Sequence, residues 1–537
     1  MSGGARHCMS RNLRQVSLRL CAAFALLALL CASGGLARAD QLYHEQYRPQ
    51  LHFTPPTQWM NDPNGMVYLD GEYHLFYQHH PYSNKWGPMH WGHAVSRDLV
   101  HWQQLPIALY PDQHGAIFSG SAVFDRNNTS GLGTATRPPL IALFAYHDHK
   151  LEKQGAIKVE SQGLAYSLDK GRSWTKYRGN PVLKNPGIRD FRDPKVFWFG
   201  PTARWIMTLA TKDQVSFYSS RDLKAWQHES DFGHGWGAHG GVWECPDLVE
   251  MGIAGEQAHQ FVLISSVNPG APNGGSGTQY FVGQFDGHRF VPESDARRAP
   301  TDARWLDYGS DDYAGVTWSG VPVSDGRTLM LGWMSNWNYA QDVPTERWRS
   351  AMTLPRELSL VRGPHGLTLR VAPAVELKTL RVRSAAIPAS QVEVPTELIS
   401  PALSGATLLE LEVTLELRTA ANASLAFRNA QGDQAVLRIN RALQRLELDR
   451  SRSGEVGFNA AFAGLQTAPM IVNSDAVRLH VFLDHSSVEV FINDGETVLT
   501  ALVFPHAPYQ SVMLSADGSI DIKTGSVYEL GSIWDKQ

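Results

Sequence analysis

The chain has 537 residues with a formal net charge of -4, and 19% of its residues are charged. The length allows two or three domains, and such a balanced charge excludes the electrostatic footprint of a nucleic-acid-binding or membrane-surface protein. The 16 tryptophans suit aromatic-lined sugar sites, although we expect most of them in the core.

Residues 1–39 have the pattern of a secretory signal peptide: a basic segment, an apolar run at 20–32 and a small-x-small cleavage motif that ends at Ala39. The apolar run is too short to span a bilayer comfortably. A lipoprotein site at Cys31 ranks second, because Leu30 before it is too large for the usual lipobox. We therefore expect cleavage after Ala39, a secreted or periplasmic protein, and no membrane span in the mature chain.

From residue 40 to about residue 360 the chain consists of short apolar runs of strand length, with little helical periodicity. Asp-Gly turns separate several of these runs, at 70–71, 286–287 and 325–326. Many short strands with regular turns predict an all-β sandwich, barrel or propeller. Strands are expected at 66–69, 72–77, 94–96, 140–146, 204–210, 215–219, 261–265, 280–285 and 329–333.

A weak internal repeat favours the propeller. A serine two residues before an aspartate, with a tryptophan soon after, recurs around Asp98, Asp169 and Asp222. The Asp-to-Asp spacings of 71 and 53 residues each fit about one four-stranded blade, and roughly 320 residues give about five blades. We expect these carboxylates to accept backbone N–H bonds in turns and the tryptophans to pack between sheets.

The pattern loosens at residues 361–388, where we expect a linker between a propeller at 40–360 and a second domain at 389–537. Strand-like runs alternate again beyond the linker, and they predict an antiparallel β-sandwich with its own core. No carboxylate cluster comparable to those of the first domain is evident there, so a structural role is expected, with sugar binding left open.

Three acidic residues share an unusual setting, each close to a proline near the start of a predicted strand. Asp62 lies in the segment WMNDPNG, Asp193 follows Arg192 in FRDP, and Glu244 lies in WECPD. One such acid is most often a turn residue, but three of them indicate a site. Arg192 can hold a carboxylate ionised or bind a substrate hydroxyl. The aromatic and thiol neighbours of Glu244 predict partly apolar surroundings, which suit a general acid.

A propeller brings the starts of its inner strands together around one channel. It would therefore collect the three acids, although 131 and 51 residues separate them. Two carboxyl groups about 5 Å apart suit retaining glycoside hydrolysis, with one as nucleophile and the other as acid/base. Histidines at 79–80 and at 147 and 149 could bind a metal but have no clear set of partners, so no metal and no other cofactor is expected.

These blocks resemble the motifs of the family 32 glycoside hydrolases, which include invertases, levanases and exo-inulinases. Segment 59–65 is similar to the nucleophile block of that family, 191–194 to its transition-state-stabiliser block and 243–247 to its acid/base block. Further similar segments follow in order between about Tyr47 and Phe504, at 76–78, 118–121, 311–315, 332–337, 353–357 and 487–491.

The resemblance implies a five-bladed β-propeller followed by a C-terminal β-sandwich, and retaining hydrolysis of terminal β-fructofuranosyl units of fructans or sucrose. By position it implies Asp62 as the nucleophile, Asp193 as a binder of fructosyl hydroxyls and Glu244 as the acid/base. Residues 334–345 are closer to levanases and exo-inulinases than to invertases. The fructosyl pocket would be lined by Asn61, Gln78, Trp86, Phe118, Ser119, Arg192 and Trp333.

Several alternatives stay open at this point. The enzyme could prefer sucrose, as an invertase does, or transfer fructosyl units to sugars. The segment 167–174 fits the Asp-box repeat of sialidases, which are also propellers. A catalytically inactive sugar-binding protein would be expected to lack at least one of the three acids. The sequence leaves the oligomeric state open.

Overall fold

The computed structural model describes residues 42–293, 301–363, 366–470 and 476–534. The signal peptide expected at 1–39 therefore lies outside the described residues. The chain divides into two units, Met1–Arg48 and Pro49–Gln537. The described part of the first unit consists of turns and contains an ion pair between Arg48 and Glu45 at 2.8 Å. In the described ranges, no helix is both long and apolar enough to cross a membrane.

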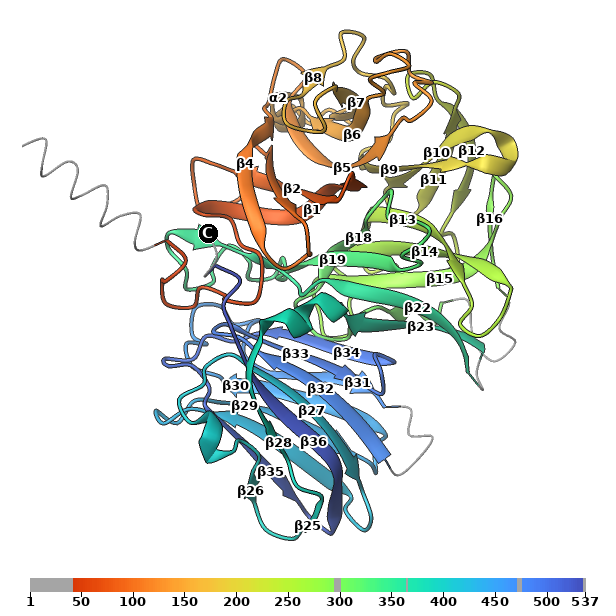
Figure 1. Ribbon diagram of the computed structural model, residues 1–537. Helices are drawn as coiled ribbons and strands as arrows, with labels where there is room; N and C mark the ends of the chain where they lie inside the picture. Colours follow the sequence, from red (N-terminus) through yellow and green to blue (C-terminus); the bar gives the residue numbers. More distant parts are fainter. Residues whose placement is uncertain (1–41, 294–300, 364–365, 471–475, 535–537) are drawn as a thin grey trace, which may run out of the picture. The chain divides into compact units, whose positions relative to one another are not determined.

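Five sheets follow one another between residues 58 and 373, and each forms one blade of a propeller (Figure 1). Each blade has four main antiparallel strands, and their order across the sheet follows their order in the chain. Blade 1 holds β1 (Gln58–Leu69), β2 (Glu72–His80), β3 (His90–Ser96) and β4 (Trp102–Leu109), and β20 (Trp348–Arg349) pairs parallel to β1. Blade 2 holds β5 (Ala116–Phe124), β6 (Leu140–His147), β7 (Glu160–Ser167) and β8 (Thr175–Lys176), with the short helix α2 (His149–Lys153) between β6 and β7.

The other three blades repeat this plan. Blade 3 holds β9 (Phe191–Phe199), β10 (Arg204–Thr211), β11 (Val215–Ser220) and β12 (Gln227–Phe232). Blade 4 holds β13 (Val242–Gly252), β14 (His259–Asn268), β15 (Gly277–Phe285) and β16 (Phe290–Pro292), with β17 (Arg304–Trp305) beside β15. Blade 5 holds β18 (Tyr313–Thr317), β19 (Thr328–Met334), β22 (Arg356–Gly363) and β23 (Gly366–Pro373), with β21 (Ala351–Met352) beside β19.

The first strand of every blade lies at the centre of the propeller (Figure 1). Strand β1 contacts β5, β5 contacts β9, β9 contacts β13, and β18 contacts both β13 and β1. These contacts close a ring of five inner strands. The five-bladed propeller predicted from the spacing of the repeat is confirmed, and the ring brings the starts of distant strands together.

The repeated Asp and Trp residues form equivalent turns between the third and fourth strands of three blades. In blade 1, the Asp98 carboxylate accepts hydrogen bonds from two backbone N–H groups at 2.8 and 3.1 Å, and the Trp102 indole donates to a backbone carbonyl at 3.0 Å. The same contacts recur at Asp222 and Trp226 in blade 3, and Asp169 accepts from a backbone N–H in blade 2. The structural role predicted for these acids is confirmed.

Residues 361–388 are not the linker that we expected from the sequence. Strands β22 and β23 form a hairpin that completes blade 5, and β24 (Arg381–Ala386) already pairs with β36 (Ile520–Leu530) of the next domain. The pattern is loose because β22 and β23 alternate buried with half-buried residues, and β24 is largely exposed. The sheets change at the short 3-10 helix η2 (Val375–Leu380).

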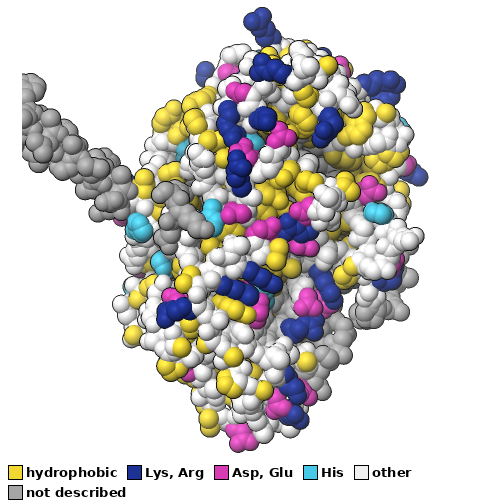
Figure 2. All heavy atoms as spheres, in the orientation of Figure 1, with side chains coloured by type: hydrophobic (Ala, Val, Ile, Leu, Met, Phe, Trp, Pro, Cys, Tyr) yellow, Lys and Arg dark blue, Asp and Glu magenta, His cyan; other side chains and the backbone are white. Residues whose placement is uncertain are grey.

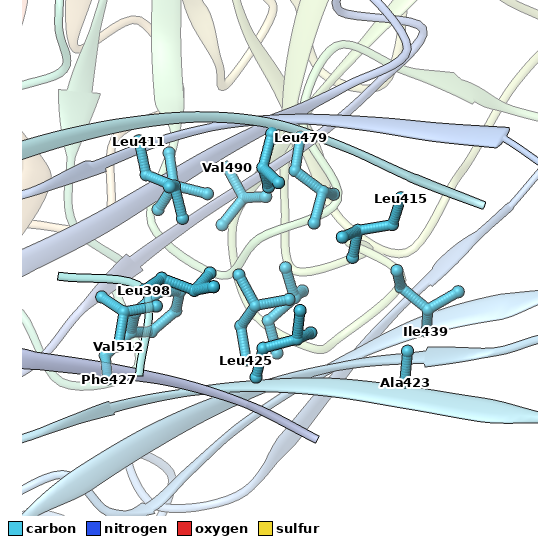
Figure 3. Close-up of a cluster of buried hydrophobic side chains, with 14 of the residues drawn as sticks. Leu398, Leu411, Leu415, Ala423, Leu425, Phe427, Ile439, Leu479, Val490 and Val512 are labelled. Carbon is cyan, nitrogen blue, oxygen red and sulfur yellow. The ribbon is translucent and has the colours of Figure 1, made fainter. Parts of the chain in front are cut away.

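The second domain consists of two antiparallel sheets with a common core. In Figure 3, leucine and valine side chains from one sheet, such as Leu411 and Leu479, face Leu425, Phe427 and Ile439 from the other. The predicted β-sandwich is confirmed. One sheet holds β24, β25 (Ser390–Val392), β27 (Leu409–Glu416), β32 (Ala476–Leu483), β33 (Ser487–Ile492), β34 (Thr497–Leu502) and β36. The other holds β26 (Thr396–Glu397), β28 (Asn422–Arg428), β29 (Gln434–Asn440), β30 (Arg445–Arg452), β31 (Leu465–Pro469) and β35 (Ser511–Ala516).

Buried ion pairs connect the propeller to the sandwich. Arg356 on β22 donates hydrogen bonds to Asp307 at 3.0 Å and, across the junction, to Glu489 on β33 at 2.7 Å. The His52 ring lies between Asp484 (2.6 Å) and Glu489 (2.8 Å). Almost none of these side chains reaches solvent. On the face drawn in Figure 2, by contrast, acidic and basic side chains are intermixed.

Candidate active site

The three acids predicted from the sequence line one cavity of about 390 Å³ at the centre of the propeller. Asp62 lies on β1, Asp193 on β9 and Glu244 on β13. The inner strands of blades 2 and 5 supply neighbours to this group, Ser119 on β5 and Tyr313 on β18. All five blades therefore contribute a residue to the site or to its support.

Each acid lies at an irregularity in its strand, which explains the neighbouring prolines. The pairing register shifts between Met60 and Pro63 in β1 and between Glu244 and Asp247 in β13. In blade 3 the pairing of β10 with β9 shifts opposite Pro194 of β9. Proline has no N–H to give to a ladder, so a bulge accommodates it. Asp193 itself has a φ of +62°, a left-handed conformation that costs energy for any residue except glycine. The bulges turn the acids toward the central cavity.

The Asp62 carboxylate receives donors on both oxygens. Ser119 Oγ donates to Oδ2 at 2.6 Å, Asn61 Nδ2 donates to Oδ1 at 3.0 Å, and the Cys245 thiol lies 3.6 Å from Oδ2. The Trp59 indole donates to Asn61 Oδ1 at 2.7 Å, which fixes the orientation of that amide. Burial raises the pKa of Asp62, the two hydrogen bonds oppose the rise, and the nearby charge of Glu244 adds to it.

The Asp193 carboxylate is almost completely buried. The backbone N–H of Cys245 donates to Oδ2 at 3.0 Å. Burial raises the pKa of Asp193, and the charges of Glu244 and Asp62 raise it further, while the Arg192 guanidinium lowers it. The negative charges of Glu244 and Asp62 therefore disfavour ionisation of Asp193 in this small space.

The Glu244 carboxylate has polar surroundings, and the apolar surroundings predicted from its sequence neighbours are wrong. Arg192 Nη2 donates to Oε1 at 2.9 Å, and the Tyr313 hydroxyl donates to Oε2. The Trp243 side chain instead packs in the core of blades 3 and 4, because alternate residues of a strand point to opposite sides. The two donors fix the position of this carboxylate at the cavity wall.

A chain of charged groups continues behind Arg192. Its Nη1 donates to Glu160 at 3.1 Å and to Asp190 at 2.9 Å, and Glu160 Oε1 lies 3.2 Å from His147 Nδ1. Burial raises the pKa of Glu160, but the Arg192 charge and the His147 hydrogen bond outweigh it and lower the pKa overall. Sequence reasoning missed Glu160, because no proline or aromatic block marks it.

Six of the seven substrate-binding residues predicted from the sequence line the cavity, and Trp333 does not. Trp333 is completely buried, and its ring packs beside Trp337 (4.8 Å between centroids) and Trp59 (6.2 Å). Trp337, four residues later, lines the cavity instead. Among the described residues none forms a hydrogen bond with the buried Gln78 Nε2, which leaves this donor to a ligand. The six that line the cavity are Asn61, Gln78, Trp86, Phe118, Ser119 and Arg192, and the lining residues that the sequence did not indicate as substrate contacts are His147, Glu152, Val159, Glu160, Arg189, Asp190, Trp337 and Gln341.

Two family models match the chain. The family 32 N-terminal domain of glycosyl hydrolases matches residues 52–373, and the family 32 C-terminal domain matches residues 376–529. The chain belongs to glycosyl hydrolase family 32. The family resemblance and the glycoside hydrolase class predicted from the sequence are thereby confirmed.

Known members of family 32 are similar over nearly the whole chain. A levanase of Bacillus subtilis (strain 168) is 45% identical over 531 residues, which cover 98% of this chain and 76% of that protein. An extracellular exo-inulinase of Aspergillus niger is 38% identical over 532 residues, which cover 94% and 98%. The crystal structure of exo-inulinase from Aspergillus awamori superposes with a TM-score of 0.82 at 35% identity, over 92% of this chain and all of that one.

Membership of family 32 excludes the sialidase alternative. The segment 167–174 that suggested it forms the turn between β7 and β8, in which Asp169 accepts hydrogen bonds from the backbone and hydroxyl of Ser173. This Asp-box-like pattern stabilises the turn between two strands of a blade and does not indicate which substrate the enzyme binds.

Proposed function

We propose that this family 32 enzyme is a retaining exo-β-fructosidase, which releases terminal β-D-fructofuranosyl units from fructans and from sucrose. The observation that carries the proposal is the convergence of Asp62, Asp193 and Glu244 on one small cavity. The levanase and exo-inulinase names of the relatives support the substrate class.

In the proposed mechanism, Asp62 attacks the anomeric carbon while Glu244 protonates the departing glycosidic oxygen. The result is a covalent fructosyl-enzyme and a released alcohol. Glu244 then takes a proton from water, which attacks the same carbon and frees Asp62. Asp193 accepts hydrogen bonds from ring hydroxyls, and these bonds strengthen as positive charge builds on the sugar.

The neighbours of each acid are consistent with its proposed role. Ser119 and Asn61 stabilise the charged form of Asp62 that a nucleophile needs. Arg192 and Tyr313 hold the Glu244 carboxylate at the cavity wall, so that its proton is delivered to one place. We propose Gln78, Trp86, Phe118 and Trp337 as further substrate contacts, since they line the same cavity.

Replacement of Glu244 by alanine tests the mechanism. We expect Glu244→Ala to slow sucrose and fructan cleavage severely, because their leaving groups need protonation. A fructoside with an acidic phenol leaving group needs less, so its first step should suffer far less and the covalent intermediate should accumulate. Azide needs no deprotonation, so it should restore turnover and give fructosyl azide of retained configuration.

The outcome that contradicts this assignment is equally definite. If Glu244→Ala slows both substrate types equally and azide rescues neither, the acid/base role passes to another carboxylate. Asp62→Ala is the matched control, since loss of the nucleophile should abolish turnover of both substrates and azide should not restore it with retention.

Exo-action has its own test. The exo-inulinase relative leads us to expect fructose as the first product from levan and inulin, and chromatography of early time points measures it. A ladder of short oligomers as first products would contradict exo-action. Fructose transfer to sucrose would favour a fructosyltransferase, and a rate on sucrose far above that on either polymer would favour an invertase.

Export of the enzyme is proposed on the pattern of residues 1–39 and on the extracellular exo-inulinase relative. Expression of the full chain in a bacterial host tests it. Mass spectrometry of the exported protein should find an N-terminus at Asp40. An uncleaved N-terminus on cytoplasmic protein would contradict it.

A further inference from the structure

Two histidines and a glutamate meet at the wall of the catalytic cavity. His147 ends β6, and His149 and Glu152 lie on helix α2, which follows directly. Glu152 Oε2 is 3.1 Å from His147 Nε2 and 3.4 Å from His149 Nδ1. The potential ligand atoms of all three residues lie within 4.8 Å of one another. The sequence showed only the two histidines, and the helical turn adds the carboxylate.

The distances from Glu152 to the two histidines match those between ligands of one metal ion. Zinc binds histidine nitrogen and carboxylate oxygen at about 2.0–2.2 Å with tetrahedral geometry, which places two ligands roughly 3.4 Å apart. The 3.1 and 3.4 Å separations at Glu152 are close to that value. A metal ion can therefore bind with small shifts of side chains that already face one another.

The surroundings of His147 and His149 orient their rings for this role. Glu160 Oε1 lies 3.2 Å from His147 Nδ1, the carboxylate–histidine arrangement that leaves Nε2 to the metal. His149 Nδ1 faces Glu152, and its buried Nε2 has no hydrogen-bond partner among the described residues. Phe118 stacks on His147 (4.3 Å between centroids), and Trp86 packs edge-on against His149 (5.6 Å). These rings form the apolar shell that is typical around metal ligands.

The turn that joins the two elements is itself fixed. Asp148 accepts hydrogen bonds from the backbone N–H groups of Lys150 (2.8 Å) and Leu151 (3.1 Å) and so caps helix α2. The cap sets the start of the helix and thereby keeps Glu152 beside His147. The cap therefore fixes the backbone from which Glu152, whose side chain is half exposed, reaches the two histidines.

We propose that His147, His149 and Glu152 form an inhibitory site for a divalent transition metal of the zinc class. Three protein ligands leave the fourth position of the ion open. His147 and Glu152 both line the catalytic cavity, so a bound ion and its water occupy space that the substrate needs. The ion also binds His147, whose other ring nitrogen contacts Glu160. Glu160 binds Arg192, and Arg192 holds Glu244 in position.

A second cluster of the described residues provides a comparison. Glu410, Glu412 and His480 on the sandwich also have ligand atoms within 4.8 Å of one another. However, Arg381 Nη2 already binds Glu410 (2.5 Å) and Glu412 (2.7 Å), so a cation already neutralises these carboxylates. This cluster lies in the other domain and serves as the internal control.

Calorimetric titration of the metal-free full-length enzyme with zinc chloride tests the site without reference to catalysis. We expect one site in the wild type, loss of that site in His149→Ala and in Glu152→Gln, and retention in His480→Ala. Thermal melting of each variant checks that it is folded, and zinc should raise the melting temperature only where the site is present. Absence of binding to the wild type, or loss of binding in His480→Ala alone, would overturn the proposal.

Inhibition of sucrose hydrolysis by zinc is measured against the metal-free rate of each variant. We expect the zinc concentration for half-inhibition to rise at least about 10-fold in His149→Ala. Substitution of residues that only support metal ligands already lowers metal affinity by about 10–100-fold, and His149 is a proposed ligand itself. His480→Ala should match the wild type. Equal inhibition of all three proteins, or binding to the wild type without inhibition, would overturn the inhibitory role.

Discussion

At the scale of single residues, the charge state of Asp62 depends on groups that the cavity itself supplies. Burial raises its pKa, which disfavours the ionised form, while the hydrogen bonds from Ser119 and Asn61 oppose this effect. Ser119 comes from the neighbouring blade and donates the shorter bond, at 2.6 Å. Asp62, the proposed nucleophile, therefore depends on a donor from an adjacent strand for its ionisation.

Replacement of Ser119 tests this dependence. A nucleophilic carboxylate must be ionised, so activity is lost as the pH falls through its pKa. Ser119→Ala removes a donor that lowers the pKa of Asp62, so the acid limb of the kcat/KM profile should move to higher pH. The control Ser119→Thr keeps the hydroxyl and should keep the limb near its original position. An acid limb that stays in place in Ser119→Ala would show that this donor does not control ionisation of Asp62.

At the scale of single elements, the irregular inner strands shape the site, and their close packing leaves no room for a side chain at some positions. Gly65 in β1 has a φ of +52°, and a Cβ added there would meet Phe76 at 2.6 Å and Trp91 at 2.8 Å. Both rings are completely buried and cannot move away easily. The turn of the chain after Asp62 therefore requires a residue without a side chain.

Substitution of Gly65 should reveal this requirement. Gly65→Ala combines a left-handed conformation with overpacking, and we expect it to lower the free energy of unfolding by about 1–3 kcal/mol and to reduce kcat. Gly71→Ala is the matched control, because Gly71 has a φ of +87° in the same hairpin but no atom within 4 Å of an added Cβ. Denaturant unfolding measures both variants. Equal losses in the two would mean that conformation and not packing determines the requirement.

At the scale of the whole molecule, buried charges connect the propeller and the sandwich. Burial lowers the pKa of His52, but Asp484 and Glu489 outweigh it and raise the pKa to about 9. Glu489 also binds Arg356, so one sandwich carboxylate contacts both the His52 ring, which precedes the first blade, and an arginine of the propeller. Removal of one member of such a buried network leaves its partners uncompensated and is strongly destabilising.

This linkage predicts how stability depends on pH. The pKa of His52 in the folded protein lies above its unfolded value of about 6.5. The contribution of His52 to the free energy of unfolding is therefore complete below pH 6.5 and is lost as the pH rises through about 9. The shift corresponds to about 3 kcal/mol. Thermal melting should therefore give a gap between wild type and His52→Gln that is widest at pH 6 and narrows toward pH 9.5.

A surface histidine serves as the control for this prediction. His288 makes a comparable contact with Glu229 at 2.7 Å, but more than half of its side chain is exposed. His288→Gln should therefore differ little from the wild type at any pH. A gap between wild type and His52→Gln that does not change with pH would contradict the linkage.

The sequence by itself determined the blade number, the β-sandwich and the three acids that line the central cavity. These features depend on local signals: the turn aspartates recur at blade spacing because each closes the same hairpin, and a proline beside each acid marks a strand irregularity. The family motifs in both domains are local signals too, since each motif is a short continuous segment. Five of the six predicted residues that line the cavity also lie in such segments, and Trp86 is the exception.

Only the tertiary structure decided the contacts between blades. Arg192 and Tyr313 lie 52 and 69 residues from Glu244, so its sequence neighbours wrongly predicted apolar surroundings. Trp333 and Trp337 belong to one motif, yet only Trp337 reaches the cavity, because the choice depends on how rings from different strands pack. Within residues 361–388, β24 forms a strand because it pairs with β36, which is distant in the chain. Local patterns record which residues turn or alternate, whereas charge, exposure and the partners of a side chain are properties of the folded neighbourhood.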